Sequence, residues 1–370
     1  MKIRFVIPCL LGLESIIANE MKTLGAEDVV SENGRVLFSG DEAMLARANI
    51  CSRFSERIQI LVGEFYARSF EELFQGTKAL PWEDWIGAYD AFPVKGYSLN
   101  STLFSVSDCQ SIIKKAVVER MKSKYGISWF DETGPVHQIQ FSIMKDKVSL
   151  LLDTTGAGLH KRGYTSHAKS APIQETLAAL CDLARLRPYH TLYDPMCGSG
   201  TILIEGAMMV HNIAPGVNRY FSAERWDVID EKIWADERNR ARDLVNYDTD
   251  FIAYGSDIDE DAIEIAKINA KRAGVERKIK FEKADIRNFE PKSEKGTVIC
   301  NPPYGERLLD IEEAQKLYKI MGEKFIRKHG WSYYVISPSE EFEKEFGRKA
   351  DKRRKLYNGM IKCQLFMYFK

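Results

Sequence analysis

Short hydrophobic runs alternate with segments of helical periodicity along the chain. The first pair is a strand-like run over residues 4–10, followed by apolar positions at helical spacing over 13–24. Strand-like runs over 57–65 and, twice, within 136–153 enclose another helical pattern over 108–125. This part of the chain is therefore predicted to be a mixed α+β region.

Beyond about residue 170 the pattern becomes a regular alternation of strand and helix. Such alternation is typical of an α/β fold, a parallel sheet with helices on both of its faces. Near the end of the chain, two apolar runs flank Asn358-Gly359, a strong hairpin signal, so an antiparallel hairpin should close one edge of the sheet. The expected strands are 191–194, 252–257, 279–282, 297–300 and 331–337, and the expected helices are 201–211, 261–273 and 312–328.

Composition narrows the class of protein. A chain of 370 residues suggests two or three domains, and 45% hydrophobic with 29% charged residues is ordinary globular usage. Lys plus Arg and Asp plus Glu are both 53, so any contact with RNA must be local. The seven scattered cysteines form no CxxC pair, which argues against a disulfide framework or a zinc site and favours a reducing cytoplasm. No apolar run reaches the roughly 20 residues that cross a membrane.

The segment from Asp194 to Thr201 is the most informative motif. A strand ends in Asp-Pro-Met-Cys-Gly-Ser-Gly and a helix begins at Thr201, so two glycines occupy a tight strand-to-helix loop. Leu203 stands where the dinucleotide fingerprint needs its third glycine, which disfavours NAD or FAD. The loop suits a cofactor without a pyrophosphate, such as S-adenosylmethionine, although glycines also occur in ordinary turns of this kind.

Acidic residues follow the next two expected strands. A carboxylate at such a strand end can accept the two ribose hydroxyls of a nucleoside or can cap the following helix. We assign Asp257 as the ribose ligand and Asp259 as the cap. Asp285 could accept the adenine amino group, with an ordinary surface aspartate as the alternative.

The sequence Asn301-Pro302-Pro303-Tyr304 follows the fourth expected strand. The prolines remove two backbone donors and stiffen the loop, which leaves the Asn301 side-chain oxygen and the Pro302 carbonyl as acceptors for an exocyclic amine. Tyr304 offers a ring on which a base pulled out of its stack can rest. Cys300 precedes a loop suited to amines, so we read it, with Cys197, as structural.

These three motifs, in this order, resemble those of class I S-adenosylmethionine-dependent amino-methyltransferases. More narrowly, Leu-His-Lys-Arg-Gly-Tyr at 159–164, Ala-Pro-Ile-Gln-Glu at 171–175 and Asn-Ile-Ala-Pro-Gly at 212–216 resemble the bacterial THUMP-domain 23S rRNA guanine-N2 methyltransferases. The resemblance implies a ferredoxin-like subdomain over 1–60 and a THUMP RNA-binding domain over 61–155. It implies a methyltransferase domain with a Rossmann-like sheet over 156–370.

The resemblance also implies partners and site residues. The cofactor would be S-adenosylmethionine, with S-adenosylhomocysteine as product, and the substrate 23S rRNA or a ribosomal assembly intermediate in the cytoplasm. No metal, membrane, obligate protein partner or second methyltransferase activity is expected. The implied base site is Asn301, Pro302, Pro303 and Tyr304, and the implied cofactor site is Asp194, Pro195, Met196, Cys197, Gly198, Ser199, Gly200, Thr201, Asp257, Ile258, Asp285 and Ile286.

Two basic segments lie outside these motifs. We expect Lys161, Arg162 and Lys169 to contact RNA or another domain, with a plain basic linker as the alternative. The run over 348–355 holds six cations and one aspartate, and it could be a solvated face or could touch phosphates beside the active-site edge.

Three other functions remain open from the sequence. N6-adenine methylation of DNA or RNA would use the same Asn-Pro-Pro-Tyr loop. A non-catalytic RNA-binding protein could keep the fold, although intact cofactor and base loops argue against it. A nicotinamide oxidoreductase is disfavoured by Leu203.

Overall fold

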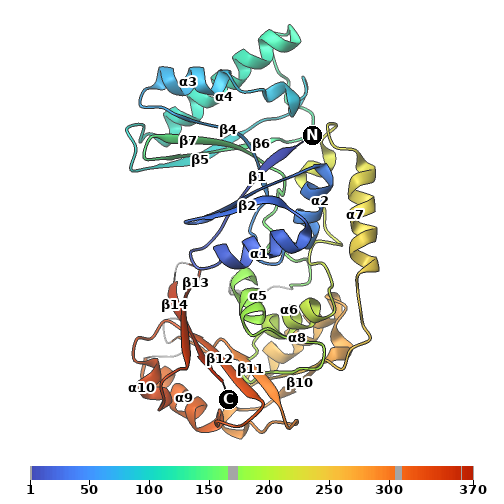
Figure 1. Ribbon diagram of the computed structural model, residues 1–370, viewed down its shortest axis with the longest axis vertical. Helices are drawn as coiled ribbons and strands as arrows, with labels where there is room; N and C mark the ends of the chain where they lie inside the picture. Colours follow the sequence, from blue (N-terminus) through green and yellow to red (C-terminus); the bar gives the residue numbers. More distant parts are fainter. Residues whose placement is uncertain (1, 166–173, 305–310, 360, 370) are drawn as a thin grey trace. The chain divides into compact units, whose positions relative to one another are not determined.

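The computed structural model describes residues 2–165, 174–304, 311–359 and 361–369 (Figure 1). Contacts divide the chain into two compact units, each with one seven-stranded sheet. The N-terminal unit comprises Met1–Cys9, Ala18–Leu159 and Arg219–Arg240, and the C-terminal unit comprises Leu10–Ile17, His160–Asn218 and Ala241–Lys370. None of the helices in the described ranges has the length and apolarity needed to span a membrane.

The N-terminal unit has the expected mixed α+β character. Its strands follow the order β2-β3-β1-β4-β7-β6-β5, in which all neighbours are antiparallel except β5 and β6. The strands are β1 (Ile3–Pro8), β2 (Glu27–Glu32), β3 (Arg35–Gly40), β4 (Gln59–Tyr66), β5 (Val94–Leu99), β6 (Gln138–Met144) and β7 (Lys147–Asp153). The helices numbered in chain order are α1 (Glu14–Leu24), α2 (Glu42–Cys51), α3 (Phe70–Lys78) and α4 (Val106–Tyr125).

The segment Arg219–Arg240 belongs to the N-terminal unit, although it follows the first helix of the catalytic motifs in sequence. Trp226 stacks on His137 with ring centroids 4.3 Å apart, and its indole N–H donates to the Val136 carbonyl at 3.0 Å. The helix α7 (Glu231–Asp243) lies beside α2 in Figure 1, where Arg47 donates to both carboxylate oxygens of Glu237, at 2.6 and 2.9 Å. Aromatic stacking and this bidentate ion pair therefore hold the segment against the N-terminal unit.

The C-terminal unit contains the expected parallel sheet and hairpin. Its strand order is β10-β9-β8-β11-β12-β14-β13, with β14 antiparallel to both neighbours and the other neighbours parallel. The strands are β8 (Thr191–Asp194), β9 (Ile252–Asp257), β10 (Ile279–Lys283), β11 (Gly296–Cys300), β12 (Trp331–Ser337), β13 (Lys352–Asn358) and β14 (Ile361–Tyr368). The helices are α5 (Gln174–Leu183), α6 (Thr201–Val210), α8 (Glu260–Arg272), α9 (Ile311–Lys324) and α10 (Phe342–Phe346).

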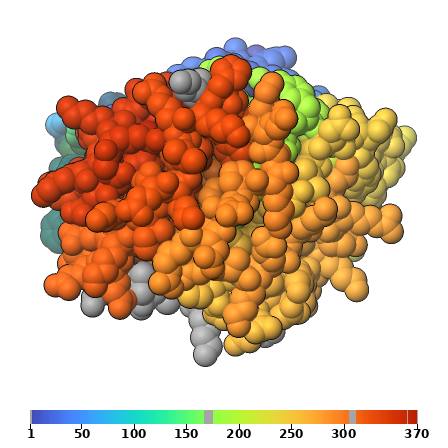
Figure 2. All heavy atoms as spheres, turned by 90° about the horizontal axis from the view of Figure 1, so that it is seen from below, coloured from blue at the N-terminus to red at the C-terminus, as the bar shows by residue number. Residues whose placement is uncertain are grey.

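Helices cover both faces of this sheet because successive side chains of each strand point to opposite faces. On one face, buried residues of β8, β11, β12 and β14 form a core with α9 and α10 that includes Tyr193, Val298 and Phe325. On the other face, Gly255 of β9 lies against Leu203 of α6. The orange and red surface of Figure 2 belongs to this second half of the chain. The parallel strands β8 to β11 direct their carboxyl ends to one edge, which we call the carboxyl edge.

Candidate active site

The glycine loop joins β8 to α6 at the carboxyl edge. Gly198 and Gly200 have φ of 50° and 81°, in the region that favours glycine, and the Gly200 N–H donates to the Cys197 carbonyl at 2.8 Å. A Cβ on Gly198 would meet nothing within 4 Å, whereas one on Gly200 would lie 3.1 Å from the Cβ of Ala266. Gly200 thus lets the loop pack against α8, and Gly198 leaves the outer side of the loop open to a ligand.

Asp257 holds this loop from the end of β9. Its Oδ2 accepts the Gly198 N–H at 2.8 Å and its Oδ1 accepts the Asp259 N–H at 3.0 Å. The Asp259 side chain accepts the Asp261 N–H at 2.9 Å and caps α8, which confirms its predicted role as a cap. The first two sequence motifs therefore form one structure, with the Asp257 carboxylate at their junction.

The missing third glycine has a structural counterpart. In the dinucleotide fingerprint that glycine allows the helix to approach the sheet closely. The close approach is made here by Gly255 on the facing strand, where a Cβ would lie only 2.5 Å from Leu203 Cδ1. In this protein the strand, and not the helix, carries the small residue at the contact.

Three buried titratable groups lie at the ends of β8 and β11. Burial, and secondarily the charge of Asp257, raises the pKa of Asp194 to about 8, although its carboxylate accepts the Met196 N–H at 3.2 Å. Burial also raises the pKa of the Cys197 and Cys300 thiols well above the ordinary range. The thiolate that covalent catalysis by cysteine requires is therefore disfavoured at both positions.

Asp285 and its neighbours follow β10. The Asp285 carboxylate accepts the backbone N–H of Arg287 at 2.8 Å and its guanidinium at 2.6 and 3.0 Å, and these bonds hold its pKa below the ordinary range. The adenine contact predicted for Asp285 would therefore use a carboxylate that already accepts hydrogen bonds from Arg287. Ile286 is buried in the core, whereas Ile258, which directly follows the neighbouring strand β9, has 65% of its surface exposed.

The Asn-Pro-Pro-Tyr loop begins at Asn301, directly after β11, next to β8 in the sheet. The Tyr304 hydroxyl donates to Asn301 Oδ1 at 2.5 Å and accepts from Asn358 Nδ2 at 3.1 Å. Burial raises the pKa of Tyr304, so the hydroxyl keeps its proton and acts as a donor. The acceptor oxygen predicted for a target amine is thus held by Tyr304 in this structure.

Asn358 is a site residue that the sequence did not reveal. Its position before Gly359 predicted a hairpin turn and nothing more. The strand β13 carries it to the loop after β11, and the hairpin is tied to α5 by a hydrogen bond from Thr176 Oγ1 to the Tyr357 carbonyl at 2.9 Å. No local signal predicts such a contact, because it depends on the pairing of β13 in the completed sheet.

The basic segment after residue 159 requires a correction. Arg162 is buried, its Nε donates to Glu205 Oε1 at 3.1 Å, and the Tyr164 hydroxyl donates to the same oxygen at 2.8 Å. Glu205 lies on α6, so Arg162 neutralises a buried carboxylate and does not offer its charge to RNA. The contact predicted for Lys161, which is exposed, stays a prediction, and Lys169 lies outside the described residues. Within the described ranges, no three His, Cys, Asp or Glu side chains are grouped to hold a metal ion.

Comparisons with protein families agree with this geometry. A family described as "RMKL-like, methyltransferase domain" matches residues 162–366, more than half of the chain. The chain is a methyltransferase of the RMKL-like family. Two further families match its N-terminal part, the RlmL ferredoxin-like domain over 4–59 and the THUMP domain over 67–153.

Three further proteins are similar to this methyltransferase along nearly its whole length. It is 43% identical to the Bacillus subtilis protein named "Putative RNA methyltransferase YpsC", over 97% of this chain and 94% of that protein. It is 35% identical to "Ribosomal RNA large subunit methyltransferase K/L" of Psychromonas ingrahamii, over 98% of this chain but 50% of that protein, so it spans half of that relative. A solved structure of SMU.472, "a putative methyltransferase complexed with SAH", shares 40% identity with a TM-score of 0.94 and covers 100% of this chain and 98% of its own.

Proposed function

We propose that this methyltransferase transfers a methyl group from S-adenosylmethionine to the exocyclic N2 amine of a guanine in 23S rRNA, in the cytoplasm. The observation that carries the proposal is the pair of Asn301 and Tyr304, whose hydrogen-bonded polar atoms follow β11 beside the glycine loop of β8. We further propose domain boundaries at 1–60, 61–155 and 156–370, with Arg219–Arg240 packed in the N-terminal unit.

The cofactor loops fit S-adenosylmethionine. The open outer side of Gly198 leaves room for a ligand against the backbone, and Asp257 keeps lone pairs for ribose hydroxyls beyond the two N–H bonds it accepts. Asp194 supplies a buried carboxyl for the cationic amino-acid tail. When bound, S-adenosylmethionine supplies an electrophilic sulfonium methyl.

The base loop orients the nucleophile. An exocyclic amine conjugated with a ring is a poor nucleophile, and two acceptors that grip its hydrogens turn its lone pair outward. Asn301 Oδ1 and the Pro302 carbonyl are those acceptors, and the Tyr304 hydroxyl must release Asn301 when a base arrives. The nitrogen becomes acidic once it is methylated, so water can take its proton and the site needs no strong general base.

RNA is the substrate class that the chain as a whole supports. A THUMP match over 67–153 precedes the catalytic sheet, and a relative that covers the chain almost completely is named a ribosomal RNA methyltransferase. The same Asn-Pro-Pro-Tyr loop would serve the N6 amine of adenine.

Transfer of labelled methyl groups tests the proposal. Purified enzyme is incubated with labelled S-adenosylmethionine and either undermethylated ribosomal RNA or unmethylated DNA, and the products are digested to nucleosides for mass spectrometry. Label in N2-methylguanosine from RNA supports the proposal. Label in N6-methyladenine from DNA, or in N6-methyladenosine from RNA, would contradict it and keep only the cofactor and the fold.

A further inference from the structure

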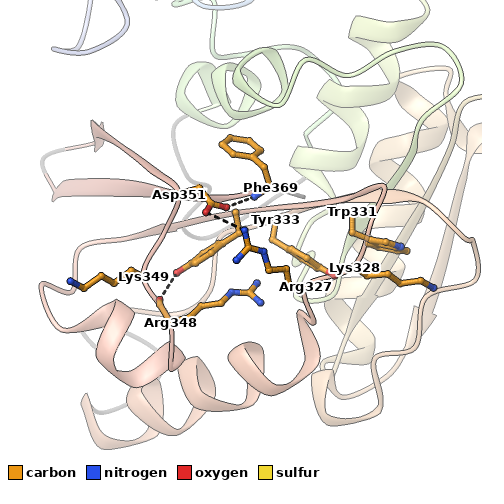
Figure 3. A pocket seen from close by; sticks show the side chains of 9 residues that line it. Arg327, Lys328, Trp331, Tyr333, Arg348, Lys349, Asp351 and Phe369 are labelled. Carbon is orange, nitrogen blue, oxygen red and sulfur yellow. Dashed lines mark hydrogen bonds and ion pairs between the residues drawn. The ribbon is translucent and has the colours of Figure 1, made fainter.

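A small cavity of about 20 Å³ lies in the C-terminal unit, away from the motifs described above (Figure 3). Four cationic side chains, one carboxylate and four aromatic rings line it. Arg327 and Lys328 come from the segment after α9, and Arg348 and Lys349 from the segment after α10. A cavity of this size admits one or two water-sized atoms, such as a single anionic oxygen.

The cavity lies at the edge of the sheet opposite to the cofactor and base loops. Trp331 is the first residue of β12, Asp351 comes just before β13, and Tyr368 is the last residue of the antiparallel β14. All three positions lie at the amino ends of the parallel strands. Since β12 has seven residues at about 3.3 Å each, roughly 20 Å separate the two edges.

Arg348 is the cation of the cavity that is best suited to bind an anion, because it packs against aromatic rings and has a donor that is unpartnered among the residues that the structure describes. Its Cζ lies 4.7 Å from the ring centre of Tyr368, 5.2 Å from that of Phe346 and 5.7 Å from that of Tyr333. Its Nη2 is buried and has no hydrogen-bond partner within the described part of the chain, and burial lowers the pKa of the guanidinium. A buried donor without an acceptor is unfavourable, and an incoming anionic oxygen would supply the missing acceptor.

Asp351, the carboxylate that lines the cavity, and Glu343 beside it already have partners. Asp351 lies 3.9 Å from Arg327 and accepts the Phe369 N–H at 2.7 Å, and Glu343 accepts from Arg353 at 2.8 Å. The two lysines are exposed, and Figure 3 shows Lys328 and Lys349 extending to opposite sides of the cavity. The charge left at the cavity is therefore positive.

The basic run over 348–355 is thus divided between two uses. Two of its later cations have partners within the unit, since Arg353 binds Glu343 and Arg354 donates to the Gly12 carbonyl at 2.7 Å. Its first residues line the cavity, at the edge opposite to the one that the sequence suggested. This corrects the predicted position beside the active-site edge.

We propose that this cavity binds a phosphodiester oxygen of the RNA substrate, so that the substrate is a folded RNA large enough to contact both edges of the sheet. This inference rests on the proposed function. Arg is suited to a phosphate oxygen because its planar guanidinium holds its N–H donors in a fixed, fork-like geometry, and the flanking lysines add counter-charge for neighbouring phosphates.

RNA binding as a function of salt tests the proposal. The affinity of the full chain for undermethylated 23S rRNA is measured between about 50 and 200 mM salt for the wild type and for Lys328→Ala/Lys349→Ala. Loss of two phosphate contacts should lower the slope of log affinity against log salt by about 2. Lys271→Ala/Arg272→Ala removes the same charge from exposed positions at the end of α8 and should leave the slope unchanged.

A second variant distinguishes specific binding in the cavity from a general effect of positive charge. Arg348→Lys keeps the charge and the contact with the aromatic rings but loses the fork, so it should weaken RNA binding several-fold at an unchanged slope. Affinity for S-adenosylmethionine, measured by calorimetry, reports folding of each variant. Wild-type affinity in Arg348→Lys, or an unchanged slope in the lysine pair, would overturn the proposal.

Two further outcomes distinguish failure of the cavity proposal from failure of the proposed function and from a site for free phosphate. A wild-type enzyme that bound no RNA would overturn the proposed function together with this inference, whereas the variant results above overturn the cavity alone. Inorganic phosphate is titrated in parallel at constant ionic strength. Phosphate binding that Arg348→Lys abolishes, with RNA binding unaffected, would identify a free-phosphate site and overturn the RNA assignment.

Discussion

Replacement of Asp194 by Asn should remove a pH dependence of cofactor binding. The pKa of this buried carboxyl is about 8 in the cofactor-free protein, and the cationic tail of the cofactor favours its ionised form. If only the ionised form binds tightly, the apparent affinity falls with the ionised fraction. Between pH 7 and pH 6, where the α-amino group of the cofactor stays protonated, S-adenosylmethionine should bind about tenfold more weakly at the lower pH.

Calorimetric titration with S-adenosylmethionine at several pH values is the assay. Wild-type binding should release close to one proton near pH 7, seen as a dependence of the measured heat on the buffer, and Asp194→Asn should release none. Asp182→Asn is the matched control, because Asp182 is a second carboxyl of the same unit whose pKa is raised by desolvation. The control should keep the wild-type profile, and a wild-type profile in Asp194→Asn would show that this carboxyl does not control cofactor binding.

The pH dependence of folding stability provides a second test of the raised pKa of Asp194, and the direction of the change is fixed. The folded-state pKa of Asp194 is raised from 3.8 to about 8, so between these pH values the folded protein binds more protons than the unfolded chain. The contribution of Asp194 to the stability of the cofactor-free protein must therefore fall as pH rises from about 4 to about 8. The difference in free energy of unfolding between wild type and Asp194→Asn should change across this window and level off above it.

Other predictions concern single side chains. Asn301→Ala should lower the single-turnover methylation rate by about 100-fold, because the amine is no longer oriented, and should leave the cofactor affinity nearly unchanged. Asp257→Ala should instead weaken cofactor binding by about tenfold or more. Equal rates in Asn301→Ala and wild type would contradict this split. Asn358→Ala removes one hydrogen bond to Tyr304 and should lower the rate about two- to tenfold without a change in cofactor affinity; a changed affinity would indicate a general structural role. Glu205→Gln removes one of the two buried carboxylates, Glu205 and Glu175, that stabilise the charge of Arg162. It should cost about 3–5 kcal/mol in chemical denaturation, and a cost below about 1 kcal/mol would show that the pair is dispensable.

The regular elements of the C-terminal unit could be predicted because their signals are local. The strands expected over 191–194, 252–257 and 331–337 are β8, β9 and β12, whose apolar runs are bounded by polar or glycine residues. The expected helix over 312–328 is shorter, since α9 ends at Lys324. The strand β2 gave no clear signal, because its residues are exposed at the edge of the sheet and lack an apolar face.

What the sequence could not predict depends on contacts between distant residues. The side chain of Arg162 looks like a surface cation in its own segment, and only the packing of that segment against α6 brings it to Glu205. The segment Arg219–Arg240 follows catalytic motifs, yet the ring of Trp226 finds its partner at His137. Periodicity describes which face of an element is buried and does not identify the residues on the other side of the interface.

Analysis of 23S rRNA from cells that carry or lack the gene for this protein tests the central claim most directly. Nucleosides from the two RNAs are compared by mass spectrometry, with wild type and Asn301→Ala each restored to the deletion strain. We expect the deletion to remove N2-methylguanosine from 23S rRNA and only the wild type to restore it. An unchanged N2-methylguanosine content, or full restoration by Asn301→Ala, would contradict the proposed function.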